Sequence, residues 1–273
     1  AKANERLNRP QIAIEQATQS LEVFRDPRYA DLRLARSLLA HTLEVYGLGL
    51  IRLEQVRESK AVLQESLHIH QQLGQRYGSV HVLDALGKVA VAEGDLSGAL
   101  SLRLQALKIA RDFGNQYSIA ILLNNLADIY TKLNDLDKSM RYQQESIELS
   151  RDIGHRWLTA IGYNNLAFMY LKFYADPNEA IRFYKESLSL FSDIEDPRGV
   201  IFTLHDLGVA TLEARQLKPS RRYFLEALDH AHQFGESEVQ LYVMSSMATA
   251  YARLGQPAYA CELCQLVLAQ PES

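Results

Sequence analysis

The chain has 273 residues, of which 47% are hydrophobic and 23% charged, and its formal net charge is -4. This length allows a sizeable hydrophobic core. The chain lacks the excess of basic residues that sequence-independent binding of nucleic acid requires. No apolar run approaches the ~20 residues of a membrane span. We therefore expect neither direct nucleic-acid binding nor a membrane segment.

The number of cysteines indicates the redox compartment, and the first residues indicate whether the chain has been processed. Two cysteines, Cys261 and Cys264, are too few for a disulfide framework, which favours a reducing, cytoplasmic setting. The sequence begins Ala1-Lys2-Ala3 without an initiator Met. This start indicates either a piece of a longer protein or a processed terminus.

The first predicted element is an amphipathic helix over residues 10–24. Its apolar residues recur on one side at Ile14, Ala17, Leu21 and Phe24. We interpret it as a degenerate half-repeat that caps the chain over residues 1–27. About nine extra residues then separate Asp26-Pro27 from Gly47, relative to a later repeat, which predicts a longer first helix in the first repeat.

The rest of the chain repeats itself about every 40 residues, which is the mark of a solenoid. A small residue recurs at Gly47, Gly87, Ala127, Ala167, Gly208 and Ala248. A second small column follows at Ser59, Ala99, Ser139, Ala180, Ser220 and Ala260. The one extra residue lies near Ala175 and is expected in a turn, and Glu195 stands where other units close on glycine. We divide 28–273 into six repeats, at about 28–75, 76–115, 116–155, 156–196, 197–236 and 237–273.

Each repeat is expected to hold two helices. In the third, apolar residues within 118–133 follow a helical period, and the partner helix spans roughly 137–152. Pro177 and Pro257 stand at the first position of a second helix, where a missing N–H costs little. Opposite the small residues we expect a core column at Val62, Leu102, Tyr142, Phe183, Tyr223 and Leu263.

The last predicted helix, 258–269, is apolar on nearly all sides. A terminal repeat needs a polar outer face, and an all-apolar helix is normally buried. We therefore expect either more chain or a second copy of the protein to cover it. The interface residues would be Tyr259, Leu263 and Leu266.

The small–tyrosine–small spacing resembles the tetratricopeptide repeat, whose usual period is ~34 residues. The longer variant has the letters IAR at 109–111 with Gly114 closing one unit, and NNLA at 124–127 opening the next. This variant is similar to the C-terminal sensor domain of maltose-regulator-type signalling ATPases and to spindle-orientation adaptor repeats. The resemblance covers about 28–270. It implies an all-α, right-handed superhelical solenoid of six helix-turn-helix repeats with an extra N-terminal helix.

The resemblance also implies a concave wall lined by the first helix of each repeat. Two positions on each first helix, three before and one after the small residue, lie four apart on one face; we call them the paired rows. They supply the candidate ligand-binding residues: Asp84, Lys88, Asn124, Asp128, Asn164, Phe168 and His205.

The asparagines of the paired rows allow two interpretations. Asn124 and Asn164 each offer a donor and an acceptor to one peptide unit of an extended ligand. Alternatively, such asparagines bond adjacent repeats and hold the stack, as we expect more strongly of Asn125 and Asn165. Lys88 and Asp128 could equally pair across neighbouring repeats with no ligand.

No catalytic or metal-binding pattern stands out. Cys261-x-x-Cys264 lacks the second pair that a zinc site needs, so packing is the better interpretation. His68-x-His70 and His230-x-His232 are spaced two apart and diverge on a helix. No phosphate-binding, dinucleotide-binding or hydrolase motif occurs. We expect no enzyme activity, no catalytic residue, no cofactor and no metal.

The leading hypothesis is a scaffold that binds a protein, a peptide or a segment of its own full-length chain. It would serve as the sensor or interaction domain of a larger cytoplasmic signalling or transcription-regulatory protein. The alternatives are a small-molecule inducer-sensing domain and a homo-oligomerisation scaffold that dimerises through the last helix.

Overall fold

The computed structural model describes residues 10–29 and 31–253, together with 255, 258 and 265. These residues form α-helices, one short 3-10 helix and no strand. The chain divides into a first unit, Ala1–Glu145, and a second unit, Ser146–Ser273.

The first unit contains α2 (Pro10–Phe24), η1 (Pro27–Tyr29), α3 (Arg33–Arg52), α4 (Val56–Gln72), α5 (Gly78–Ala92), α6 (Leu96–Asp112) and α7 (Gln116–Lys132). The second unit contains α9 (Arg156–Lys172), α10 (Pro177–Asp193), α11 (Pro197–Glu213), α12 (Leu217–Gln233) and α13 (Ser237–Arg253). The unit boundary falls within α8 (Leu136–Asp152).

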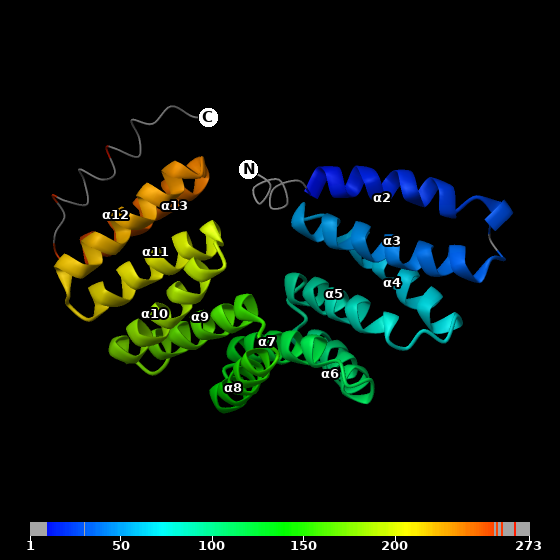
Figure 1. Cartoon of the computed structure of the whole chain (residues 1–273), viewed down its shortest axis with the longest axis horizontal. Coiled ribbons are helices and arrows are strands. Elements are labelled where there is room, and N and C mark those ends of the chain that lie inside the picture. The colour runs from blue at the N-terminus through cyan, green and yellow to red at the C-terminus, as the bar shows by residue number, and fades with distance from the viewer. Residues whose placement is uncertain (1–9, 30, 254, 256–257, 259–264, 266–273) are drawn as a thin grey trace. The chain divides into compact units, whose positions relative to one another are not determined.

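Helices pack in chain order within each unit (Figure 1). From α2 to α7 and from α9 to α13, each helix contacts the next one along the chain. First helices of successive repeats also contact each other: α3 contacts α5, and α11 contacts α13. This nearest-neighbour packing buries faces that one helix pair could not bury alone, and it confirms the predicted all-α array of paired helices.

The predicted N-terminal helix is present as α2, which buries Ala17 and Leu21 against α3. The longer first helix is also present, because α3 has 20 residues where α5 has 15 and α7 has 17. Part of the extra length lies elsewhere, in η1 and the residues that follow it.

The two small columns meet inside each helix pair. Serines of the second column donate hydrogen bonds to carbonyl oxygens of the first: Ser59 to Gly47 (2.9 Å), Ser139 to Ala127 (2.9 Å) and Ser220 to Gly208 (2.8 Å). A buried hydroxyl is tolerated here because its hydrogen bond is satisfied by the neighbouring helix.

The predicted core column on the second helices is wrong by one residue. Val62, Leu102, Tyr142 and Phe183 are only half-buried, and Leu263 lies outside the described residues. Tyr223 alone among the described members of the predicted column is buried, beside Phe224. The column that faces the small residues is Leu63, Arg103, Gln143, Tyr184 and Phe224. At Gly47, a Cβ would lie 2.7 Å from Leu63 Cγ, so this column closes the helix pair. One residue turns a helix by about 100°, enough to exchange a core face for a flank.

The turns use proline and aspartate as predicted. Pro177 is the first residue of α10, and the Asp176 carboxylate accepts backbone hydrogen bonds from Asn178 and Glu179 (both 3.1 Å). The extra residue of this repeat lies in the same turn, where Ala175 has a φ of 50°. Pro257 lies outside the described residues.

Each turn between consecutive helices from α3 to α13 places one residue in the left-handed region of φ. Gly114 is one such residue, with a φ of 66°, and no atom would lie within 4 Å of an added Cβ. Glu195 adopts a φ of 54° at the equivalent position, so it carries a backbone strain that glycine would avoid.

We expect Gly114→Ala to lower the free energy of unfolding by about 1 kcal/mol, because alanine is strained at positive φ while no contact changes. Glu195→Gly should raise it by less than about 1 kcal/mol, since the gain is offset by the entropy of glycine. Urea unfolding measures both changes. Equal midpoints for both variants and the parent chain would contradict this account.

Candidate functional site

In the first unit, the paired rows are held by ion pairs of the fold itself. Asp84 on α5 is 8% exposed. Its carboxylate accepts hydrogen bonds from Arg103 Nε on α6 (3.1 Å) and Asn125 Nδ2 on α7 (2.9 Å). Arg103 also donates to the backbone oxygen of Asn125 (2.8 Å). Asp84 therefore joins three helices, and Asn125 bonds the adjacent repeat as expected.

The exposed charges of these rows pair along their own helices. Lys88 Nζ lies 3.3 Å from Asp84, one turn earlier on α5. Asp128 pairs with Lys132 in the same way on α7. The alternative that Lys88 and Asp128 pair across neighbouring repeats is therefore wrong, because each finds an opposite charge four residues away.

The asparagines and the histidine bond neighbouring helices. Asn124 Oδ1 accepts from Gln143 Nε2 on α8 (3.2 Å), within the first unit. In the second unit, Asn164 Oδ1 accepts from the buried Thr203 hydroxyl on α11 (3.4 Å). His205 is 4% exposed, and its Nε2 lies 2.6 Å from Ser246 Oγ on α13. These three paired-row side chains therefore connect neighbouring helices of the array.

The second unit also contains a half-exposed carboxylate, Asp206, and a buried phenol, Tyr184, that interact electrostatically. His205 Nδ1 is 2.9 Å from the Asp206 carboxylate. Burial, with a smaller contribution from the Asp206 charge, raises the pKa of Tyr184 well above its usual value. Tyr184 therefore stays neutral across the physiological range.

Several aromatic side chains, of a kind that the sequence pattern assigns to packing columns, are exposed beside the paired rows. Phe202 on α11 is 39% exposed and Tyr242 on α13 is 53% exposed, with ring centroids 6.2 Å apart. Each lies three residues before a paired-row residue, on the same helix face. Phe168 on α9 is 47% exposed. The second unit thus presents aromatic rings where the first unit presents charges.

The signal for these rings was present in the sequence. The position six residues before the small column reads Ile121, Ile161, Phe202 and Tyr242 in successive repeats. In these four repeats an apolar residue lies one turn before the paired-row positions on the same face, whereas the first two repeats have His41 and His81 there. It was overlooked because tyrosine and phenylalanine also fill packing columns elsewhere.

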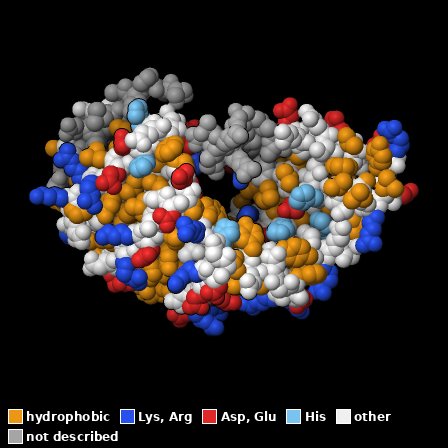
Figure 2. Space-filling model, viewed as in Figure 1, with side chains coloured by type: hydrophobic (Ala, Val, Ile, Leu, Met, Phe, Trp, Pro, Cys, Tyr) orange, Lys and Arg blue, Asp and Glu red, His pale blue; other side chains and the backbone are white. Residues whose placement is uncertain are grey.

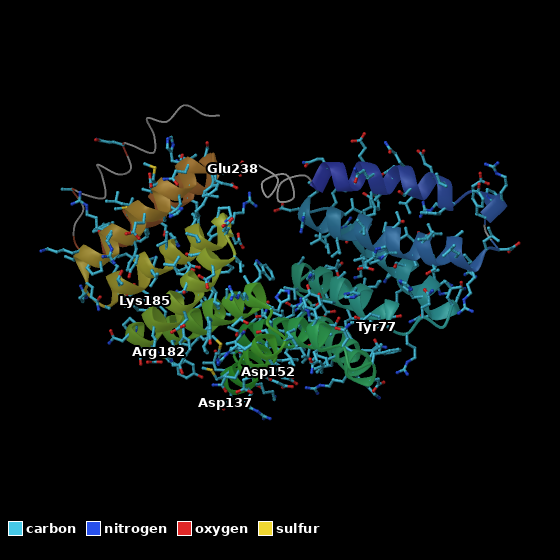
Figure 3. All side chains as sticks on the ribbon, viewed as in Figure 1. Tyr77, Asp137, Asp152, Arg182, Lys185 and Glu238 are labelled. Atoms are coloured by element: carbon cyan, nitrogen blue, oxygen red, sulfur yellow. The ribbon has the colours of Figure 1, made fainter. Side chains whose placement is uncertain are left out.

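The remaining surface is mixed. Figure 2 shows hydrophobic side chains among cations and anions on the face in view. Arg182 on α10, labelled in Figure 3, lies over the Phe183 ring at 3.9 Å and bonds Glu179 Oε2 (2.7 Å). A cation covers Phe183, so this ring is a poorer contact for a partner than Phe202 or Tyr242.

Several predicted features fall outside the described residues: Tyr259, Leu263, Leu266, Cys261 and Cys264. Within the described part of the chain, no group of three or more His, Cys, Asp or Glu residues is placed to hold a metal ion. No described helix is both long and apolar enough to cross a membrane.

A family model described as tetratricopeptide repeat matches residues 118–193, from α7 through α10. Residues 118–193 therefore carry tetratricopeptide repeats. The predicted resemblance is therefore confirmed, and with it a fold that generally serves as a scaffold rather than as a catalyst. No curated protein sequence matches the chain.

Solved structures of repeat proteins share the fold. BtubC from P. vanneervenii is 20% identical, with a TM-score of 0.70, over 83% of this chain and 92% of that one. A Rap protein complexed with competence and sporulation factor is 9% identical, with a TM-score of 0.65, over 95% and 96%.

A third similar structure is a signal transduction ATPase with numerous domains, from Pyrococcus horikoshii, which has a tetratricopeptide repeat sensor. It is 18% identical, with a TM-score of 0.69, over 94% of this chain and 41% of that one. This chain thus spans less than half of the length of the ATPase. At these identities the likeness shows the fold alone.

Proposed function

We propose that this tetratricopeptide array binds a protein segment or peptide along the paired rows of the second unit. The observation that carries the proposal is the pair of exposed rings, Phe202 and Tyr242, on adjacent first helices. Large aromatic side chains supply much of the energy of protein–peptide contacts, because they bury a large area at low entropic cost.

The surroundings of the two rings suit a peptide with apolar side chains. His205 lies beneath them, 5.1 Å from the Tyr242 ring, and is fixed by Ser246 and Asp206. Rings held by a bonded support lose little freedom when a partner docks, which improves affinity. Asp84 and His205, both buried, then act as supports, whereas Phe168 and the half-buried Asn164 face the ligand.

The comparisons support an interaction role within signalling. The Rap structure contains competence and sporulation factor, and the ATPase carries this fold as its sensor. We infer that the chain is the sensor or interaction domain of a larger cytoplasmic signalling or transcription-regulatory protein. Its partner would be a protein, a peptide or another segment of its own full-length chain.

Panning a displayed library of random peptides against the chain tests this function. Selected peptides should carry apolar anchors, and Phe202→Ser/Tyr242→Ser should weaken their binding at least about tenfold, the loss of roughly 1.4 kcal/mol. Fluorescence anisotropy with labelled peptides measures the change.

The matched control removes exposed apolar side chains from α12 and its C-terminal cap. Leu225 is 48% exposed and Phe234 is 41% exposed, so Leu225→Ser/Phe234→Ser deletes comparable surface. Binding should survive in this control. If no peptide is selected, or if both double variants bind equally well, the second unit's rows are not the site.

A further inference from the structure

The second unit contains a carboxylate without a cationic partner. Asp206 on α11 has a side chain that is 34% exposed. Among the described residues, its carboxylate bonds His205 Nδ1 at 2.9 Å, and no lysine or arginine lies within ion-pairing distance. A neutral His205 donates one hydrogen bond and leaves the negative charge of Asp206 uncompensated. This carboxylate is therefore open to a cation from a partner.

The equivalent place in the first unit is neutralised by the fold itself. There the Asp84 carboxylate lies 3.1 Å from Arg103 Nε and 3.3 Å from Lys88 Nζ. Asn125, on the next first helix, donates a hydrogen bond to the same carboxylate. These four positions thus hold one acid, two cations and one amide, and they leave no negative charge unpaired.

The same four positions hold a different set in the second unit. Two repeats later, in the order of Asp84, Lys88, Arg103 and Asn125, they are Asn164, Phe168, Tyr184 and Asp206. The acid now stands at the amide position, and aromatic residues stand at both cation positions. Burial and the charge of Asp206 raise the pKa of Tyr184, as expected if the two side chains are close. The second unit keeps a carboxylate here but lacks the cations that would neutralise it.

A neighbouring helix shows which group fits beside a ring and a carboxylate. On α10, Glu179 and Phe183 lie four residues apart. Arg182 bonds Glu179 Oε2 at 2.7 Å and also lies over the Phe183 ring at 3.9 Å. On α11, Phe202 and Asp206 lie four residues apart in the same way, on one face of the helix. Phe202 is 39% exposed, and Asp206 has no arginine partner.

We propose that the peptide bound along the second unit's rows carries an arginine that bonds Asp206 and stacks on Phe202. This inference rests on the proposed peptide site and names one residue of its partner. A planar guanidinium can stack on a ring and donate to a carboxylate at the same time, which a lysine ammonium does less well.

The geometry of the rings also sets the spacing within the peptide. The ring centroids of Phe202 and Tyr242 are 6.2 Å apart. An extended chain rises about 3.3 Å per residue and places alternate side chains on one face. An apolar residue two positions from the arginine would therefore reach Tyr242.

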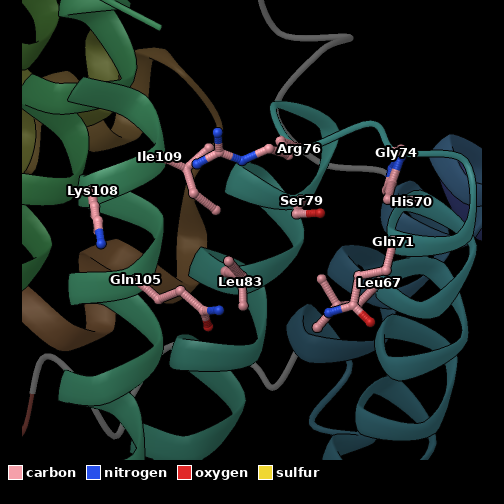
Figure 4. A pocket seen from close by; sticks show the side chains of 10 residues that line it. All are labelled: Leu67, His70, Gln71, Gly74, Arg76, Ser79, Leu83, Gln105, Lys108 and Ile109. Atoms are coloured by element: carbon pink, nitrogen blue, oxygen red, sulfur yellow. The ribbon is translucent and has the colours of Figure 1, made fainter. Parts of the chain in front are cut away.

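The cavity of the first unit would not accept this arginine. It has a volume of about 420 Å³ and lies among α4, α5 and α6 (Figure 4). Arg76 and Lys108 line it, and its described lining residues include no aspartate or glutamate. Because like charges repel, a peptide with an arginine favours the second unit's rows over this cavity.

Three displayed peptide libraries test the inference. Each peptide has a fixed central residue, which is arginine, glutamine or glutamate, between four random residues on each side. The random residues exclude lysine and arginine. Panned against the chain, the arginine library should yield the tightest binders, by about tenfold, and they should carry an apolar residue two positions from the arginine.

Asp206→Asn removes the charge and keeps an acceptor for His205. Asparagine is the native residue at the equivalent positions, Asn125 and Asn165, so the variant should fold. Fluorescence anisotropy should show a selected arginine peptide binding the variant about tenfold more weakly than the parent chain. The same peptide with citrulline in place of arginine keeps the shape without the charge, and it should bind both proteins equally.

The matched control is Asp229→Asn on α12. Asp229 is exposed, and its carboxylate also accepts a hydrogen bond from a neutral donor, Gln233 Nε2 (2.8 Å). It belongs to a second helix and not to the paired rows. The control makes the same charge change and should bind the arginine peptide as the parent chain does.

Two outcomes would overturn this inference alone. They are equal binding of the arginine peptide by Asp206→Asn and the parent chain, and a glutamine library whose binders are as tight as those of the arginine library. In both cases Phe202→Ser/Tyr242→Ser would still weaken the selected peptides, and the peptide site would stand. If no library yields a binder, the proposed function and this inference fail together.

Discussion

Replacing Phe191 with alanine should lower the free energy of unfolding by about 3–5 kcal/mol, the usual cost of truncating a buried phenylalanine. The side chain is 2% exposed within the core of the second unit. It fits because Gly199 has no side chain, since a Cβ there would lie 2.3 Å from Phe191 Cδ1. The glycine serves packing here, not backbone conformation.

The same pair of positions, eight residues apart, is filled differently in each repeat. The pairs are His70 with Gly78, Ala110 with Ser118, Ser150 with Leu158, Phe191 with Gly199, and Ala231 with Val239. A large residue on one helix is matched by glycine on the next, and a small residue by a larger one. Close packing leaves room for only one large side chain at each junction.

This complementarity predicts a rescue. Gly199→Val alone should overpack the junction and cost about 1–3 kcal/mol. Phe191→Ala/Gly199→Val copies the Ala231–Val239 pair and should be more stable than the sum of the single effects predicts, by at least about 1 kcal/mol.

Urea unfolding followed by Trp157 fluorescence measures these variants. Trp157 is the single tryptophan, and its Nε1 donates to Asp196 Oδ2 (3.1 Å), so it reports on the second unit near Gly199. Strictly additive single effects would show that the two positions do not share one space.

The second large effect is expected at Arg103. Arg103→Leu should lower the free energy of unfolding by about 3–5 kcal/mol, because it leaves the Asp84 carboxylate buried without its main partner. The two side chains are only 5% and 12% exposed. Leucine itself fits the position, since Leu63 fills the equivalent place in the first repeat. The loss therefore comes from the charge and not from the shape.

A double variant separates charge from shape at this junction. The next repeat joins the same two positions with a neutral hydrogen bond, from Gln143 to Asn124 (3.2 Å). Asp84→Asn/Arg103→Gln copies that pair and should recover most of the stability lost in Arg103→Leu. Lys88→Met removes only the half-exposed partner of Asp84 and should cost less than about 1 kcal/mol.

Urea unfolding followed by circular dichroism checks this set. A loss in Lys88→Met as large as that in Arg103→Leu would contradict the assignment of Arg103 as the main partner of Asp84.

The geometry of a single helix does not determine which candidate site residues are exposed. A helix wheel puts Asp84 and Lys88 on one face, but Asp84 is buried because Arg103 and Asn125 reach it from two other helices. His205 is buried for the same reason, beneath Tyr242 and Ser246. Exposure at a paired-row position depends on the length of side chains from neighbouring helices, which the periodicity of one helix does not contain.

The sequence by itself determined the repeat, the paired helices and the turns. Small residues recur because helices must approach closely, and the proline at 177 and the glycine at 114 sit at turns because their local conformations require it. Only the tertiary structure decided which second-helix column closes the pairs, which rings stay exposed and where a carboxylate, Asp206, lacks a cation. Local spacing encodes what one turn or helix needs, whereas burial and unpaired charges result from three helices meeting.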